Sequence, residues 1–284
     1  MLLTQRILYV AAFDAIEPAV TAQVAELSKA LTATVHVMTT AGPRYQLWRV
    51  GSDAEASARA RIEDVAERLR GLRARVGETL VVKGNLATAA MEAAPRMEAE
   101  YIVIGAGESA AEDPAYVRTS ARTLARSARE NVWICKPEAE PALQHVLCTF
   151  DASRGSADGI RVSTDLCRQF NARLQLMSVL HPPPAGMLGG TDVERDEAEQ
   201  AARRALHDQR LAFLEGFNFD GVKLARNLVW ADRASPAILA EADKHRDGLL
   251  VLGVSGQRRF QSMMLGNTAE KVLDACPSSM LFVK

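Results

Sequence analysis

Three glycines near the end of the sequence have the spacing of a phosphate-binding loop. Gly253 and Gly256 are separated by two residues, and Gly266 follows after nine more. Glycine lets a backbone approach a ligand closely because it has no Cβ. The apolar residues 249–252 predict a buried parallel strand, and residues 269–273 open a helix, whose first N–H groups attract anions. We therefore expect a phosphate site here, although no Gly-Lys-Ser/Thr follows as in a Walker A loop.

The polar residues around these glycines have two possible roles. Asn267 and Thr268 can donate to a phosphate from an amide and a hydroxyl group. The alternative is a capping box over residues 267–270, which would satisfy the same N–H groups and is compatible with anion binding. Arg258, inside the nine-residue gap, is a candidate charged donor, with a solvated loop residue as its alternative role.

A carboxylate follows a second predicted strand, residues 146–150. Asp151 can accept a hydrogen bond from an exocyclic amine or a ribose hydroxyl, because the carboxyl ends of parallel strands face the ligand crevice of open α/β sheets. The alternative is that Asp151 only caps the helix expected to follow it. Its pairing with the glycine loop favours the binding role.

The sequence contains two copies of one unit. Residues 7–11 match residues 146–150 at an offset of 139, and residues 101–105 match residues 249–253 at an offset of 148. The second copy therefore carries about nine extra residues, which the Pro- and Gly-rich run 182–190 places before its long helix. Strands and helices alternate in each copy, which predicts an α/β fold with two tandem, doubly wound, five-stranded parallel sheets.

The expected helices lie at corresponding places in the two copies. They cover residues 17–31, 53–75, 86–97 and 120–129 in the first copy, and 156–170, 193–214, 236–244 and 267–275 in the second. Residues 136–141 contain two prolines and two carboxylates and read as a linker. We therefore expect one domain over residues 1–137 and another over residues 142–284.

The G-x-x-G-x9-G spacing of Gly253, Gly256 and Gly266 resembles the nucleotide-binding motif of the universal stress protein family, and the repeat resembles its tandem two-domain members. One position departs from the motif: the family usually has Ser or Thr directly after the third glycine, where this sequence has Asn267. The resemblance covers nearly all of both copies. It implies the strand order 3-2-1-4-5 in each sheet, of the Rossmann-like type found in adenine nucleotide alpha hydrolases.

The resemblance also implies a ligand, ATP or another adenine nucleotide with or without Mg²⁺. Asp151 and Ser153 would contact the nucleoside, the main chain around Val179 would contact the adenine edge, and the glycine loop would hold the phosphates. The implied cofactor-binding residues are Asp151, Ser153, Val179, Gly253, Gly256, Arg258, Gly266, Asn267 and Thr268.

The first copy lacks the matching residues. The two offsets place Ala12 where the second copy has Asp151, Glu108 where it has Gly256, and Arg118 where it has Gly266. A glutamate would repel phosphate, and an arginine has a Cβ where the backbone must approach the ligand. We therefore expect nucleotide binding by the second copy alone, with the first copy structural.

The resemblance further implies how the copies assemble. Residues 131–136 and 279–284, the last strands, would meet antiparallel inside one chain and form a pseudo-dimer without exposed edges. The module would respond to stress by acting on a protein partner that the sequence does not identify.

Composition limits the classes of partner. The 284 residues include 34 Lys and Arg against 35 Asp and Glu, so a net charge of -1 gives no reason to expect nucleic acid or a membrane surface as a partner. No long apolar run or signal region is present, which favours a cytoplasmic protein without a membrane span. The four cysteines are scattered, which indicates small core residues rather than a metal site.

Enzyme functions are disfavoured. The Gly253–Gly256 stretch is similar to a hydrolase elbow, but Gln257 stands where the last glycine is needed. The five histidines form no metal-binding or triad pattern, and any ATP hydrolysis should be slow because no base or arginine finger is identifiable. The alternative function is an interaction scaffold, or a binder of a non-nucleotide small molecule such as an amphiphile.

Overall fold

The computed structural model describes residues 5–12, 17–41, 52–106, 114–137, 139–181, 192–254 and 265–284. The first half of the chain supplies the strands β1 (Arg6–Val10), β2 (Thr34–Thr40), β3 (Arg75–Val82), β4 (Tyr101–Gly105) and β5 (Asn131–Cys135). The second half supplies β6 (His145–Thr149), β7 (Arg173–Leu180), β8 (Lys223–Trp230), β9 (Leu249–Gly253) and β10 (Ser279–Val283).

Helices connect these strands in the same order in both halves. The first half has α1 (Glu17–Ala30), α2 (Ser52–Gly71), α3 (Leu86–Arg96) and α4 (Pro114–Ser127). The second half has α5 (Arg154–Phe170), α6 (Asp192–Leu214), α7 (Ala234–Ala242), the short 3-10 helix η1 (Asp243–His245) and α8 (Asn267–Ala275).

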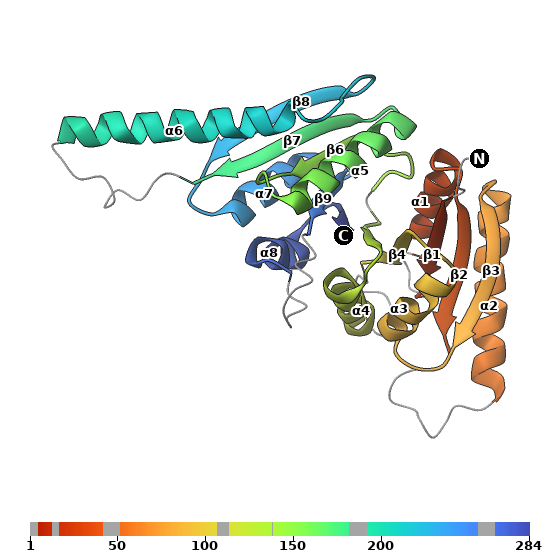
Figure 1. Ribbon diagram of the computed structural model, residues 1–284. Helices are drawn as coiled ribbons and strands as arrows, with labels where there is room; N and C mark the ends of the chain where they lie inside the picture. Colours follow the sequence, from red (N-terminus) through yellow and green to blue (C-terminus); the bar gives the residue numbers. More distant parts are fainter. Residues whose placement is uncertain are drawn as a thin grey trace.

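The strands form one ten-stranded sheet in the order β3-β2-β1-β4-β5-β10-β9-β6-β7-β8. Each half therefore has the expected order 3-2-1-4-5 with parallel neighbours, and the two halves lie side by side (Figure 1). β5 and β10 pair antiparallel at the centre, with Trp133 opposite Leu281. The two strand edges that separate halves would expose are thereby paired with each other.

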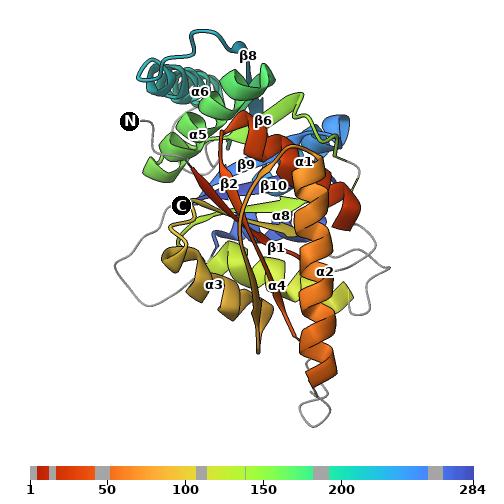
Figure 2. The same ribbon diagram turned by 90° about the vertical axis from the view of Figure 1, so that its right-hand side faces the viewer.

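Helices cover both faces of the sheet, because successive side chains on a strand point to opposite sides. On β1, Ile7 and Tyr9 belong to the core under α1, α2, α5 and α6, whereas Leu8 and Val10 belong to the core under α3, α4, α7 and α8. Figure 2 shows α1 and α2 grouped apart from α3 and α4. Burial on both faces explains why every residue of β4 is buried.

The two halves make equivalent backbone hydrogen bonds at the carboxyl ends of their central strands. The N–H of Ala11 donates to the Met38 carbonyl at 2.8 Å, and 139 residues later the N–H of Phe150 donates to Met177 at 2.9 Å. At the larger offset, Ala106 donates to Cys135 as Val254 donates to Val283, both at 2.8 Å. The two sequence offsets, 139 and 148, can therefore be used to identify equivalent residues at the carboxyl ends of the strands in the two halves.

The extra residues of the second half lie mainly after its long helix, so their expected place before that helix was wrong. The connections before α2 and α6, residues 41–51 and 181–191, have equal length. The connection after α2 covers only residues 72–74, whereas the one after α6 covers residues 215–222. In addition, α6 has 23 residues and α2 has 20.

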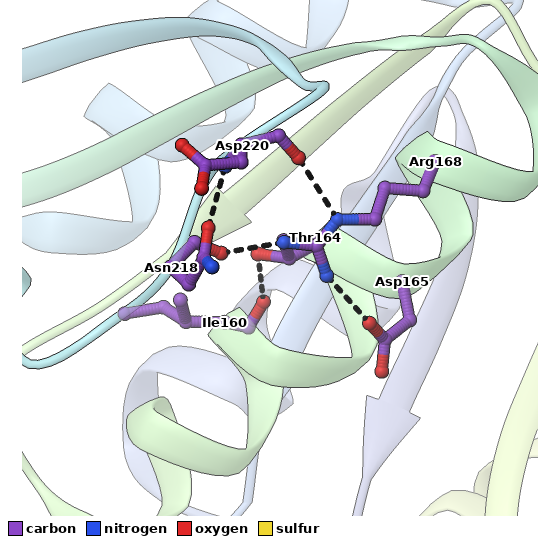
Figure 3. Close-up of polar contacts among 6 residues, drawn as sticks. All are labelled: Ile160, Thr164, Asp165, Arg168, Asn218 and Asp220. Carbon is purple, nitrogen blue, oxygen red and sulfur yellow. Dashed lines mark hydrogen bonds and ion pairs between the residues drawn. The ribbon is translucent and has the colours of Figure 1, made fainter.

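The longer connection after α6 is fixed to the end of α5, as Figure 3 shows. Arg168 donates from Nη2 to the Asn218 carbonyl at 2.7 Å and from Nε to the Asp220 carbonyl at 3.1 Å. Phe217, in the same connection, makes an edge contact with Phe213 of α6 at 5.4 Å between ring centroids. The insertion is thus a packed part of the second half.

Two expected helix bounds in the first half were wrong. α4 begins at Pro114 rather than at residue 120, and α2 ends at Gly71 rather than at residue 75. Arg73 has a positive φ of 64°, which breaks the helical conformation before β3 starts at Arg75. The other helix ends lie within two residues of the expected positions.

The cysteines are core residues, as the sequence indicated. Cys135, Cys148, Cys167 and Cys276 are all buried and free. Burial raises the pKa of each thiol, to about 12 for Cys148 and Cys167, so none is a reactive thiolate at neutral pH.

Among the helices in the described part of the chain, none combines the length and the apolar character needed to cross a lipid bilayer.

Candidate functional site

The candidate site lies at the carboxyl ends of β6 and β9, which are neighbours in the sheet. Thr149 of β6 pairs with Leu252 of β9 on one side and with Met177 of β7 on the other. The helices that follow β6 and β9 pack into opposite cores, α5 on one face and α8 on the other. Their N-termini therefore flank the carboxyl ends of β6 and β9, at the point where the strand order reverses and where open α/β sheets bind ligands; we call this place the crevice.

Residues 150–153 form the turn between β6 and α5. The Oδ1 of Asp151 accepts from the Ser153 N–H at 3.0 Å and from the Ser156 hydroxyl at 3.1 Å. Ser153 is the N-cap of α5, and its hydroxyl accepts from the Ser156 N–H at 3.3 Å. Ser153, not Asp151, is therefore the capping residue. Asp151 stabilises the cap by accepting hydrogen bonds from Ser153 and Ser156.

The Asp151 carboxylate is charged, and only one of its two oxygens accepts hydrogen bonds from described residues. Burial alone would raise the pKa of Asp151, but the hydrogen bonds from Ser153 and Ser156 and the nearby charge of Arg210 on α6 outweigh it, so its pKa lies below its usual range. The residue is exposed, and no hydrogen bond from a described residue reaches Oδ2. That oxygen can accept from a ligand hydroxyl or amine.

The sequence analysis did not identify three residues that shape this turn. Ser156 supplies the hydroxyl that links the cap to Asp151, and Arg210 lies on a distant helix. Ala152 has φ +62°, a left-handed conformation that costs a residue with a Cβ about 1 kcal/mol. The Ser-x-x-Ser spacing of a helix cap was readable in the sequence, whereas the strained backbone and the Arg210 approach required the fold.

The Ala152→Gly variant is expected to be more stable than the native chain by about 1 kcal/mol, because glycine adopts positive φ without steric cost. Urea unfolding measures the difference. Ala157→Gly, inside α5, is the matched control and should lose about 1 kcal/mol, since its helical backbone gains nothing from glycine. Equal losses in the two variants would show that the surrounding turn, not Ala152 itself, carries the strain.

Gly253 ends β9 and lies against the start of α5. A Cβ at this position would lie 1.9 Å from the carbonyl oxygen of Gly155 and 2.9 Å from the Cα of Ser156. Gly159, one turn later, also lies near β9, although less tightly, since its Cβ would be 3.2 Å from the Gly253 nitrogen. The glycine at position 253 is therefore required by helix packing, which also holds Ser156 beside Asp151.

The helix on the other side of the crevice has an uncapped N-terminus. Gly266 is the N-cap of α8 with no side chain to cap it, and the space where its Cβ would be is open. Asn267 is the first helical residue, so the alternative of a capping box starting at Asn267 was wrong. The first helical hydrogen bond comes from the Glu270 N–H to the Gly266 carbonyl. Among the described residues, no acceptor takes the N–H groups that precede it, as is usual at a helix start.

The acidic residue in this first turn is neutralised by the first half of the chain. The Glu270 carboxylate forms a two-pronged ion pair with Arg126 of α4, through Nε at 2.9 Å and through Nη2. A free carboxylate here would weaken anion binding at the N-terminus of α8. The pairing thus keeps the region suitable for a phosphate.

The remaining predicted residues divide into two groups. Val179 is the penultimate residue of β7 and pairs with Val229. It lies two residues after Met177, the partner of Thr149 at the end of β6, so its main chain lies at the same edge of the sheet as the turn with Asp151. Thr268, in the first turn of α8, is partly buried. Gly256 and Arg258 lie outside the described residues.

The corresponding helix of the first half starts too early to offer such N–H groups. α4 begins at Pro114, four residues before Arg118, the counterpart of Gly266. The N–H of Arg118 is therefore inside the helix and is directed to the carbonyl of Pro114. No helix N-terminus remains at the equivalent place.

Larger polar residues stand at the corresponding positions of β1 and α1 in the first half. Glu17 occupies the position of Ser156, and Tyr9 that of Cys148. The Glu17 carboxylate is buried, accepts from the Thr21 hydroxyl, and pairs with Arg68 of α2 at 2.7 Å. The Tyr9 hydroxyl lies 3.3 Å from the Thr21 hydroxyl. Glu17 is therefore tied to α2 of its own half, whereas its counterpart Ser156 donates to Asp151.

Known proteins resemble the chain in sequence over its second half and in fold over its whole length. The sequence pattern of the universal stress protein family matches residues 142–284. A comparison with curated proteins found no match. A universal stress protein from Archaeoglobus fulgidus is 14% identical, with 98% of each chain covered and a TM-score of 0.68. A protein of unknown function from Pseudomonas aeruginosa PAO1 is 18% identical, covering 99% of this chain and 92% of that one, with a TM-score of 0.69.

Proposed function

Because this chain belongs to the universal stress protein family, we propose that it is a stress-response module whose second half binds ATP or another adenine nucleotide, with or without Mg²⁺. The observation that carries the proposal is the start of α8, where the N-cap is Gly266, no described side chain caps the helix, and no described atom lies where a Cβ of residue 266 would be. An anion is the ligand that such a helix start favours.

The nucleotide would lie across the crevice between α5 and α8. Its phosphates would accept from the first N–H groups of α8 and from the Asn267 amide, in place of the hydroxyl usual in the family. The free oxygen of Asp151 would accept from the ribose hydroxyls, and the main chain at Val179 would meet the adenine edge. Gly256 and Arg258 remain candidates for the phosphates.

We propose that the first half binds no nucleotide and serves as a structural partner. Support comes from the early start of α4, which leaves no helix N-terminus at the place equivalent to Gly266, and from the Glu17–Arg68 pair at the position equivalent to Ser156. The antiparallel pairing of β5 with β10 then acts as a built-in dimer contact, a pseudo-dimer within one chain. The Arg126–Glu270 pair links the structural half to the binding half.

The function proposed is binding rather than catalysis. A nucleotide bound to the second half would change the conformation of a surface to which an unidentified protein partner binds. The other candidate function is a scaffold or a binder of a non-nucleotide molecule. It predicts that the purified protein carries no ligand or a ligand other than a nucleotide. Mass spectrometry of the ligand released by mild denaturation separates them: ATP near one per chain supports the proposal, and a lipid-like mass contradicts it.

Isothermal titration of the full chain with ATP is expected to give one site per chain. Asp151→Asn should bind about tenfold more weakly, because the amide keeps the hydrogen bonds to Ser153 and Ser156 but loses the charge that favours the ribose hydroxyls. Asp165→Asn, at the exposed ion pair with Arg168 on the same helix, is the control and should bind like the native chain. Two equal sites per chain would contradict the proposed asymmetry.

A further inference from the structure

The outer strand of the first half, β3, pairs irregularly with β2. Two residues of β3, Gly77 and Glu78, stand opposite the single residue His36 of β2, which makes a β-bulge. In the second half the corresponding strands pair without a shift, Arg173–Leu180 against Lys223–Trp230. The bulge is therefore a feature of the first half, at the strand that forms one free edge of the sheet (Figure 1).

The ring of His36 fills this bulge. Its Nδ1 accepts a hydrogen bond from the Glu78 N–H at 3.1 Å. A Cβ on Gly77 would lie 2.8 Å from Cε1 and 2.9 Å from Nδ1 of the ring, so a larger residue would have to displace it. His36 is 9% exposed and pairs with Leu8, on the face of the sheet that α3 covers. The side chain thus satisfies a backbone N–H of β3 where the ladder is disrupted.

The hydrogen bond from Glu78 requires a neutral His36. A ring nitrogen that accepts carries no proton, so the single ring proton of neutral His36 is on Nε2. In the protonated ring both nitrogens are donors, and Nδ1 would point its own hydrogen at the Glu78 N–H. Proton uptake by His36 therefore breaks the bond and leaves two donors facing each other.

The surroundings of His36 favour the neutral ring. Burial lowers the pKa of His36 below its ordinary value of 6.5, Glu78 on β3 acts in the opposite direction, and Arg6 on β1 adds to the lowering. Arg6 is itself paired with Glu98, after α3, and the residues that α3 buries are all Leu or Ala. Neutral His36 thus contributes stability above pH 6.5 that is lost as the pH falls through the lowered pKa.

We propose that the β2–β3 bulge is an acid-sensitive switch: when His36 takes up a proton at Nδ1, the Glu78 N–H is released and β3 loosens at the free edge of the first half. The second half has Gln175 at the position of His36, 139 residues later, and a regular strand pair there, so its outer strand does not respond in this way. The switch is independent of the nucleotide proposed above, and it gives the first half a response to acid.

The ¹⁵N shifts of the His36 ring in the full chain test the first step. At neutral pH, Nδ1 is expected to have the shift of an unprotonated nitrogen and Nε2 that of a protonated one. The midpoint of the ring titration should lie below 6.5. A neutral ring with its proton on Nδ1 could not accept from Glu78 and would overturn the inference.

Amide hydrogen exchange of the full chain tests the release of β3. The protection factor of the Glu78 N–H, which is corrected for intrinsic exchange at each pH, should fall about tenfold from about pH 7.5 to about pH 5. The Ala231 N–H donates to the Leu180 carbonyl at 3.0 Å, at the end of the corresponding strand pair of the second half. It is the control and should keep its protection.

Two variants separate the proton from the shape of the side chain. His36→Asn keeps an acceptor near the position of Nδ1 but does not titrate, so the Glu78 N–H should stay protected in acid. His207→Gln, on α6 in the second half, removes another histidine and should keep the native response. If protection of Glu78 does not change with pH in the native chain, or falls equally in folded His36→Asn, the inference is wrong.

Discussion

The Gly266→Asp variant is expected to bind ATP about a hundredfold more weakly than the native chain while unfolding at a slightly higher temperature. The backbone at Gly266 has φ −57° and ψ 152°, which any residue can adopt, and the space for a Cβ is open. An aspartate would cap the first N–H groups of α8 and place a negative charge where the phosphates are proposed to bind. Isothermal titration and thermal unfolding measure the two opposite effects.

Two controls separate the charge from the loss of glycine. Gly266→Ala adds a Cβ but no acceptor, so it should change ATP affinity by less than about threefold and lower stability by a few tenths of a kcal/mol. Arg118→Asp puts the same carboxylate at the corresponding place in α4 and should leave ATP binding unchanged. A stabilised Gly266→Asp variant that still bound ATP normally would place the phosphates away from α8.

The repeat made the fold readable from sequence. β9 was predicted to within one residue, and α8 was predicted at both ends, because the strand is a short apolar run and the helix follows a glycine. The start of α4 was missed because its first turn lacks apolar periodicity, although Pro114 at the first helical position is a signal for it. The extra residues were misplaced because proline and glycine mark a loop but do not measure its length.

The candidate site was only partly readable, because its geometry depends on how α5 lies on β9. The sequence indicated Asp151 and the cap region but not the bond from Ser156, which exists only because the helix start is held close to the strand. It assigned Gly253 to the ligand, which stays a prediction, and it did not foresee the packing of Gly253 against α5. The spacing of the glycines can be read from the sequence. Whether a glycine is needed for a ligand or for packing depends on the atoms that surround it in the fold.

The Gly253→Ala variant is therefore expected to be destabilised by about 3 kcal/mol even without nucleotide. Its Cβ would lie 1.9 Å from the Gly155 carbonyl oxygen and 2.5 Å from the carbonyl carbon. Both are backbone atoms in the first turn of α5 and cannot rotate away as the end of a flexible side chain could. Urea unfolding of nucleotide-free protein measures the loss.

Gly266→Ala is the matched control for this packing argument, since the same substitution in the same motif meets no atom within 4 Å. The two alanine variants should therefore differ in stability by about 2 kcal/mol or more. The ligand-based explanation of Gly253 predicts the reverse pattern, in which Gly253→Ala unfolds like the native chain but loses ATP. If that pattern were observed, α5 would have to move away from β9, and the hydrogen bond between Ser156 and Asp151 could not be a fixed part of the site.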